Sequence, residues 1–211
     1  MRGTTMAALT IGVGLAVSGC ASDAGYGDER ALPATSASPS ATPSATATPQ
    51  FLTAAELPSK QGPWHAGEVT AGLPDPTYAC LADALPAADS SSRTFTGDLA
   101  AEFRETVVVT ADQDAAMALV QRVATAISGC ADRVEGNNTS ADYSLPDKLR
   151  GLRVIGVYFA PKDSEYHFQL YGVGHAGNLV VVTSLSDMGR ATEAPRDQFR
   201  FTADKAIATT S

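Results

Sequence analysis

The stretch ETVVVTADQDAAMALVQRVATAISGC, residues 105–130, carries the strongest fold signal in the chain, because a strand pattern runs directly into a helix pattern. Its β-branched start, Thr106 to Thr110, predicts a buried strand. Apolar residues then recur at helical spacing and predict a helix over 112–128 with one buried face. These residues are Ala116, Leu119, Val120, Val123, Ala124 and Ile127.

Both ends of this helix are marked in the sequence. Thr110 and Gln113 have the spacing of a capping box, in which each side chain bonds the backbone N–H of the other residue. Gly129 predicts the C-terminal stop, since glycine adopts the backbone conformation that ends many helices. The helix is therefore expected to begin and end within the quoted stretch.

The flanking segments predict shorter elements. Several prolines make residues 51–77 irregular, residues 78–85 predict a short helix, and residues 131–150 predict a loop. A last helix is expected from Pro195 to Ala208, with proline in its first turn. Between them, three strand-like runs joined by short connections predict an antiparallel meander. These runs are Leu152–Phe159, Glu165–Val173 and Asn178–Leu185.

This order of elements predicts one α+β domain over residues 51–211. We expect an antiparallel β-sheet that includes a C-terminal three-stranded meander, with helices packed on one face and one disulfide. Residues of the middle run alternate between the two faces. Tyr166, Phe168 and Leu170 are expected to face the core, and the opposite face carries Glu165, His167, Gln169 and Tyr171.

The face with His167 is the candidate ligand-contacting surface, and three interpretations stay open. It is a solvated sheet face, a ligand-contacting face, or part of a catalytic site that takes an acid from elsewhere in the fold. Neighbours on one face of a strand lie about 7 Å apart, so Glu165 and Gln169 are too far away to orient His167. His65-x-x-Glu68 lacks the helix of a metalloprotease motif. The sequence predicts no catalytic residue, metal or cofactor.

The first twenty residues have the pattern of an export signal. Met6 to Gly19 form an apolar run that as a helix rises about 21 Å, too short to cross a bilayer. Val17-Ser18-Gly19-Cys20 resembles the bacterial lipobox. The resemblance implies that residues 1–19 are a signal peptide and that Cys20 carries the lipid that anchors the protein. The alternative is an ordinary secretory signal with an incidental cysteine.

Residues 20–50 are expected to be a tether. They are rich in Ala, Ser, Thr and Pro, and they have no apolar periodicity. Such a segment buries too little surface to offset its ordering entropy and is expected to be disordered. The sequence thus predicts a domain held at the extracytoplasmic face of the cell membrane.

The cysteine count and the charge fit an exported protein. With Cys20 attached to lipid, Cys80 and Cys130 remain, and two such cysteines are expected to pair in an oxidising compartment. Two buried free thiols are the alternative, and zinc would need more ligands than these cysteines and three scattered histidines supply. The net charge of −8 argues against nucleic acid as a partner.

Residues 107–132, VVVTADQDAAMALVQRVATAISGCAD, and the Gly-rich last strands resemble the PknH-like extracellular sensor domains of actinobacterial kinases and lipoproteins. The resemblance covers about residues 64–209, but this chain lacks the second disulfide of the kinase members. It implies a non-enzymatic domain that binds a small molecule or another envelope component outside the cell. The alternatives are an extracytoplasmic hydrolase that uses His167, and a structural or interaction domain without a ligand pocket.

Overall fold

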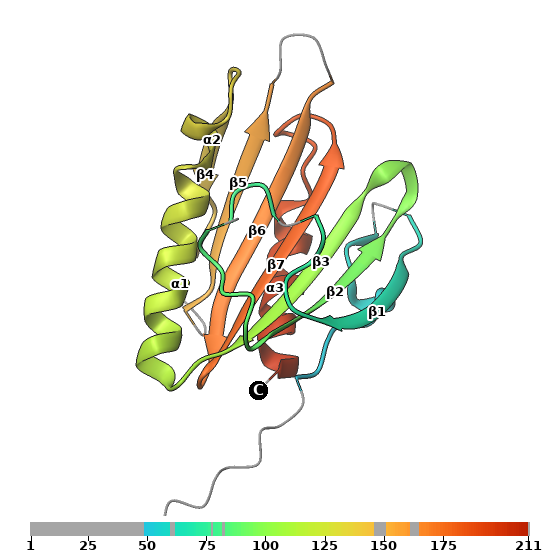
Figure 1. The fold of residues 1–211 in the computed structure, drawn as a ribbon. Coiled ribbons are helices and arrows are strands. Elements are labelled where there is room, and N and C mark those ends of the chain that lie inside the picture. Colours follow the sequence, from blue (N-terminus) through green and yellow to red (C-terminus); the bar gives the residue numbers. More distant parts are fainter. Residues whose placement is uncertain are drawn as a thin grey trace, which may run out of the picture. The chain divides into compact units, whose positions relative to one another are not determined.

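The computed structural model describes residues 49–59, 62–76, 78–81, 83–145, 151–160 and 165–210. The predicted signal peptide, the lipid attachment at Cys20 and the tether up to residue 48 lie outside the described residues. The described part is built on a single β-sheet (Figure 1).

Seven strands form this sheet in the order β1-β2-β3-β7-β6-β5-β4, and every neighbouring pair is antiparallel. β3 pairs with β2 on one side and with β7 on the other, so it lies inside the sheet. The strands are β1 (His65–Ala71), β2 (Ser90–Thr96), β3 (Glu102–Val109), β4 (Thr139–Asp142), β5 (Arg153–Phe159), β6 (His167–Ala176) and β7 (Leu179–Met188).

Helices cover both faces of the sheet. α1 (Gln113–Ser128) packs on one face, where it meets residues such as Ile155. α3 (Arg196–Thr210) packs on the opposite face with residues such as Val154, and in Figure 1 it lies behind the strands. The sheet is therefore the middle of three layers. The one-turn helices are η1 (Ala54–Glu56), η3 (Asp98–Ala100) and α2 (Cys130–Arg133).

The predicted fold class was wrong in two respects. The three C-terminal runs do not form a three-stranded meander of their own, because they are β5, β6 and β7 of a seven-stranded sheet. The helices do not share one face. The reason lies in the strands: Val154 and Ile155 are neighbours that point to opposite faces, and both are buried. A sheet that is apolar on both faces needs a cover on each of them.

Three strands were missed because they lack an apolar alternation. All seven residues of β1 are exposed, and this strand is defined by its pairing with β2. β2 consists mainly of serine and threonine, although Ser90 and Ser92 are buried. β4 and α2 lie in the segment predicted as a loop, and the described residues of 78–85 form turns in place of the predicted helix.

α1 begins on a different cap from the predicted one. Asp112 is the N-cap residue, and its carboxylate accepts a hydrogen bond from the backbone N–H of Ala115 at 2.8 Å. Thr110 instead donates from its hydroxyl to the carbonyl of Asn178 at 2.7 Å. Aspartate is a strong N-cap, which leaves Thr110 free to join the start of α1 to the turn between β6 and β7.

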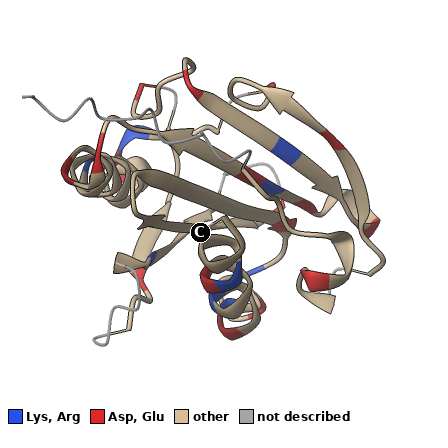
Figure 2. Cartoon of the chain, turned by 90° about the horizontal axis from the view of Figure 1, so that it is seen from below, with Lys and Arg blue, Asp and Glu red and all other residues tan. Residues whose placement is uncertain are grey.

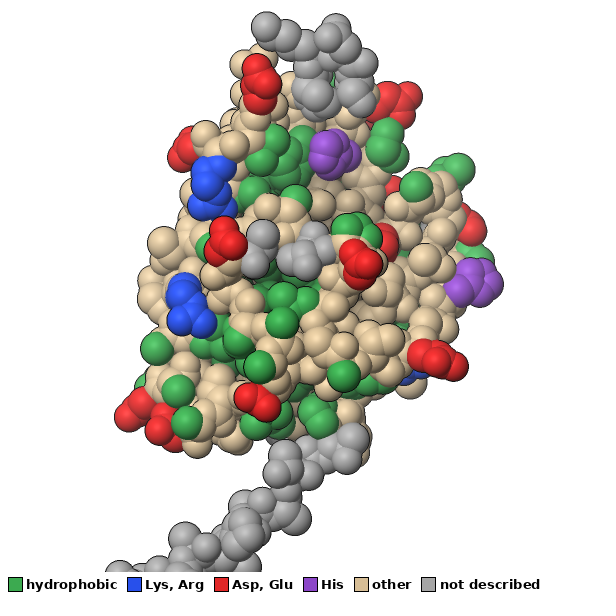
Figure 3. Space-filling view, in the orientation of Figure 1, with side chains coloured by type: hydrophobic (Ala, Val, Ile, Leu, Met, Phe, Trp, Pro, Cys, Tyr) green, Lys and Arg blue, Asp and Glu red, His purple; other side chains and the backbone are tan. Residues whose placement is uncertain are grey.

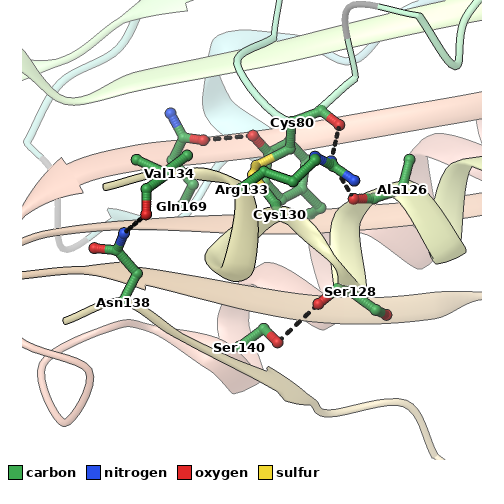
Figure 4. The surroundings of a disulfide bond; sticks show 10 residues. Cys80, Ala126, Ser128, Cys130, Arg133, Val134, Asn138, Ser140 and Gln169 are labelled. Carbon is green, nitrogen blue, oxygen red and sulfur yellow. Dashed lines mark hydrogen bonds between the residues drawn. A yellow bond between two sulfur atoms is a disulfide. The ribbon is translucent and has the colours of Figure 1, made fainter. Parts of the chain in front are cut away.

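Residues 72–89, here named the disulfide strap, also cover the α1 face. Tyr78 is buried beside α1, and its hydroxyl shares a hydrogen bond of 2.9 Å with Thr106 of β3. The predicted disulfide is present and joins Cys80 of the strap to Cys130 of α2 (Figure 4). The strap is thus bonded covalently to the helix layer and through Tyr78 to the sheet.

Residues 50–59, here named the N-terminal strap, cover the α3 face. Leu52 is fully buried in the same cluster as the apolar residues of α3. Its backbone N–H donates to the carboxylate of Glu105 in β3 at 2.9 Å. Its carbonyl accepts a hydrogen bond from Arg93 of β2 at 3.3 Å. Both main-chain groups of one residue are therefore held by side chains of the sheet.

Candidate functional site

The four residues of the predicted ligand face do not form one accessible surface. Tyr171 is 1% exposed and lies in the core on the α1 face, where its hydroxyl donates to Gln169. His167 stacks on Phe159 of β5, with ring centroids 4.5 Å apart. Glu165 is exposed and precedes β6. The structure brings Gln169 and Tyr171 together, and it directs His167 against a neighbouring strand.

Burial decides the protonation of two of these residues. Desolvation lowers the pKa of His167 and raises the pKa of Tyr171, so both favour their neutral forms. Within the described residues, no ion pair joins His167 to a carboxylate. A neutral imidazole stacked on a phenyl ring is arranged for packing.

A pocket of about 350 Å³ opens where β5 ends and β6 begins. Tyr158 belongs to the apolar cluster on the α3 face, and its cross-strand partner Thr139 comes from β4. Tyr166, which was expected in the core, is 50% exposed. We name this site the tyrosine pocket, and its lining residues are Asn137, Thr139, Tyr158, Phe159, Ala160, Tyr166, His167, Gly189, Arg190 and Ala191.

Two tyrosines and an arginine give the pocket its chemistry. Tyr158 donates to the hydroxyl of Tyr143 at 2.8 Å, and burial raises the pKa of Tyr158 so that its hydroxyl stays protonated. The carbonyl of Tyr166 accepts from the N–H of Gly189 at 2.8 Å. The guanidinium of Arg190 lies over the Tyr166 ring, 5.5 Å from its centroid. Aromatic surface and a positive charge thus meet in one pocket.

The turn after β7 positions Arg190. Gly189 has a φ of 127°, a conformation that favours glycine. The backbone N–H of Arg190 donates to the carboxylate of Glu193 at 2.6 Å. Sequence reasoning missed both Tyr158 and Arg190. The only signal for Arg190 was a glycine next to an arginine after a strand.

A buried carboxyl group that the sequence did not single out lies on the α3 face. Glu105 is 0% exposed, one of its oxygens accepts from Leu52, and the other has no hydrogen-bond partner among the described residues. Burial raises the pKa of Glu105 to about 7. Since Glu105 bonds the N-terminal strap, we assign it to the structure of the domain and not to the tyrosine pocket.

Basic side chains and metal-ligand residues are dispersed over the described domain (Figure 2). Lys and Arg are scattered over the described domain in Figure 2. In the ranges that the structure describes, no three His, Cys, Asp or Glu side chains are grouped to hold a metal ion. None of the described helices is long and apolar enough to span a membrane.

No family model matches this chain, and no curated protein is significantly similar to it. Among solved structures, the chain is similar to the extracellular domain of PknH from Mycobacterium tuberculosis, with a TM-score of 0.48 and 18% sequence identity. The match covers 74% of this chain and 92% of that chain.

Proposed function

We propose that this domain is a non-enzymatic, sensor-like module that binds a small ligand in the tyrosine pocket. The observation that carries the proposal is the meeting of Tyr158, Tyr166 and Arg190 in one cavity of about 350 Å³. Aromatic side chains pack on flat rings, and guanidinium groups pair with carboxylates and phosphates. The pocket therefore suits a small molecule that carries both a ring and an anionic group.

In this proposal the ligand site is exposed at the extracytoplasmic face of the cell membrane. The lipid on Cys20 is the anchor, and residues 20–50 are the tether. The lipobox-like motif supports this arrangement, and so does the disulfide, because such bonds persist mainly in oxidising compartments. The net charge of −8 supports a partner other than nucleic acid.

The two alternative functions are less well supported. A hydrolase would need a base within reach of a partner that orients it, and His167 is stacked on Phe159 instead. A purely structural domain would not need the tyrosine pocket. Ligand binding is the function that uses both the aromatic walls and Arg190.

The binding proposal is tested with four probes and two variants. Isothermal titration is performed with benzoate, phenyl phosphate, benzyl alcohol and acetate, so that ring and anion are varied separately. We expect the two ring-bearing anions to bind and the other two probes to bind at least about tenfold more weakly. Tyr166→Ala and Arg190→Gln are expected to reduce the affinity for benzoate by about tenfold or more.

Phe201→Ala is the matched control, because Phe201 is an exposed aromatic residue of α3, 71% accessible, outside the pocket. Its affinity for benzoate should equal that of the unmodified protein. Saturable binding that Tyr166→Ala and Arg190→Gln leave unchanged would place the ligand elsewhere. No binding of either ring-bearing anion would contradict the proposed ligand class.

The anchor is tested separately through Cys20. The unmodified protein should enter the detergent phase in Triton X-114 partitioning, and its mature N-terminus should carry acyl chains by mass spectrometry. Cys20→Ala should remain unprocessed or be released into the medium. A cleaved, membrane-held Cys20→Ala protein would rule out lipidation at this position.

A further inference from the structure

A second pocket, of about 340 Å³, lies on the α1 face of the molecule. Its walls are Arg122 of α1, Arg133 of α2 and Asp83 of the disulfide strap, together with Cys80 and small alanine side chains. Figure 3 shows two separate basic patches on the side of α1 and α2, with acidic and apolar side chains between them. We name this site the arginine pocket.

Both guanidinium groups are held by main-chain carbonyls. Arg122 donates from Nε to the carbonyl of Ala84 at 3.1 Å. Arg133 donates from Nη2 to the carbonyls of Ala126 at 2.7 Å and Cys80 at 3.3 Å, directly beside the disulfide (Figure 4). A neutral carbonyl fixes the position of a guanidinium but does not cancel its charge, and the remaining N–H groups of the fork stay available.

These contacts distinguish the two arginines from others in the fold. Arg104, Arg153 and Arg200 each pair with a carboxylate at 2.5–3.2 Å. Over the described ranges, no ion pair engages Arg122 or Arg133. Two arginines and one acid, Asp83, leave the pocket lining with an excess of positive charge, which favours an anionic group on the ligand.

From this arrangement we propose that the arginine pocket binds a small organic carboxylate that also carries an ammonium group. The carboxylate accepts hydrogen bonds from Arg122 and Arg133, because the planar guanidinium fork matches carboxylate geometry. Asp83 is the acid of the lining and pairs with the ammonium group. The alanine side chains leave an apolar wall that suits a short side chain on the ligand.

The walls of the pocket are bonded to one another. Arg122 and Arg133 both connect the helix layer to the disulfide strap, and the Cys80–Cys130 bond closes the same contact. A preformed site loses less entropy on binding. The inference is independent of the proposed function, since the arginine and tyrosine pockets share no residue.

Isothermal titration of the disulfide-intact protein with four probes tests the inference. The probes are alanine, alanyl-alanine, acetate and ethylamine, which separate the two charges and vary their spacing. At least one of the two zwitterions should bind about tenfold more tightly than acetate, and ethylamine should not bind. Arg122→Gln and Arg133→Gln should each weaken zwitterion binding by about tenfold or more.

Two further variants separate a binding role from a structural role. Asp83→Asn should abolish the preference for the zwitterion over acetate while acetate still binds, a change that loss of folding would not produce. Arg200→Gln removes an arginine of α3, on the other face, and should leave binding unchanged. Because Arg133 also contacts the last turn of α1, thermal unfolding of each variant is measured, and Arg133→Lys serves as the charge-preserving version.

Three outcomes would overturn the inference. No saturable heat with any of the four probes would show that the pocket takes no such ligand. Unchanged affinity in folded Arg122→Gln and Arg133→Gln proteins would place binding elsewhere. Binding of acetate that is as tight as binding of either zwitterion would show that the site takes an anion without an ammonium group.

Discussion

The two faces of the sheet are covered by similar parts, a long helix and an irregular strap, but the straps are held by different chemistry. The disulfide strap is joined to α2 by the covalent Cys80–Cys130 bond. The N-terminal strap is held by burial of Leu52 and by hydrogen bonds to side chains of β3 and β2. One attachment therefore responds to reductant, and the other responds to protonation.

This difference follows from what each segment can bury. The described residues of the disulfide strap form turns without regular backbone pairing, so a covalent bond restricts the strap most effectively. The N-terminal strap has Leu52 and Leu57 as apolar anchors, and it can rely on the core. Two irregular segments that cover opposite faces of one sheet are thus held by different means, one by a disulfide and the other by apolar burial.

The largest effect is expected from breaking the covalent attachment. The double variant Cys80→Ala/Cys130→Ala removes a cross-link between residues 50 positions apart, which lowers the free energy of unfolding by about 4 kcal/mol. Urea unfolding of the unmodified protein with and without reductant should show the same loss. The double variant serves as the control, because reductant must leave its unfolding midpoint unchanged. An unmodified protein insensitive to full reduction would contradict the role given to this bond.

The next largest effect is expected from removing the main apolar contact of the other strap. Leu52→Ala should reduce the free energy of unfolding by about 3 kcal/mol, since Leu52 is fully buried. Leu99→Ala is the matched control, because Leu99 is 90% exposed and should change stability by less than about 0.5 kcal/mol. Equal effects in urea unfolding would mean that the N-terminal strap does not belong to the core.

Protonation of Glu105 should change the stability of the N-terminal strap attachment. The folded protein keeps this proton up to about pH 7, whereas the unfolded chain releases it near the ordinary value of 4.5. The stabilisation is therefore complete below pH 4.5 and declines as the pH rises to 7, by about 3 kcal/mol. The charged groups nearby are Arg93 of β2 and Glu56 of the strap.

The check is a series of urea unfolding curves between pH 4.5 and pH 8. Glu105→Gln keeps an acceptor for the Leu52 N–H but does not titrate, so its free energy of unfolding should vary less over this range. Reduction of the disulfide should not alter the pH dependence. If Glu105→Gln and the unmodified protein lose the same stability, another group is responsible.

The smallest effect is expected at the surface of the strap. Glu56 pairs with Lys205 of α3 at 2.8 Å, and this hydrogen bond together with the Thr53 backbone lowers the pKa of Glu56 to about 2. Glu56 therefore stabilises the folded state above pH 4.5, and this stabilisation is lost as the pH falls towards 2. The pH dependence is opposite in direction to that of Glu105. Lys205→Ala should cost about 0.5 kcal/mol at neutral pH, and added salt should reduce that loss.

Arg200→Ala is the comparison variant for this last prediction. Arg200 also lies on α3, but its ion pair with Asp197 is confined to the helix. Arg200→Ala should therefore leave the loss of unfolding free energy at acidic pH unchanged. An identical acid response in the two variants would show that Lys205 does not hold the strap.

Helical and strand periodicity gave the predictable part of the fold. The six apolar residues of α1 were expected at their positions, since a helix with one buried face repeats every three or four residues. The faces were not predictable in the same way. Val154 and Ile155 are both apolar, so both faces of this strand can be buried. Only the position of α3 in the structure shows that a second helix covers the face of Val154.

The candidate site was less predictable because it depends on where a strand begins. Tyr166 fits the core side of an alternating pattern, but β6 starts at His167, so the alternation does not extend to Tyr166. Arg190 reaches the pocket through the turn at Gly189. Both facts depend on strand ends and turn geometry, which residue periodicity does not encode.

Leu52 also determines how the domain carries mechanical load. A force applied to the chain at residue 50 passes through Leu52 to Glu105 of β3, an interior strand, and through Arg93 to β2. It does not reach the exposed edge strand β1 first. Pulling on residue 50 therefore loads the strap attachment, made of two side-chain hydrogen bonds and the burial of Leu52, before it loads any backbone ladder of the sheet.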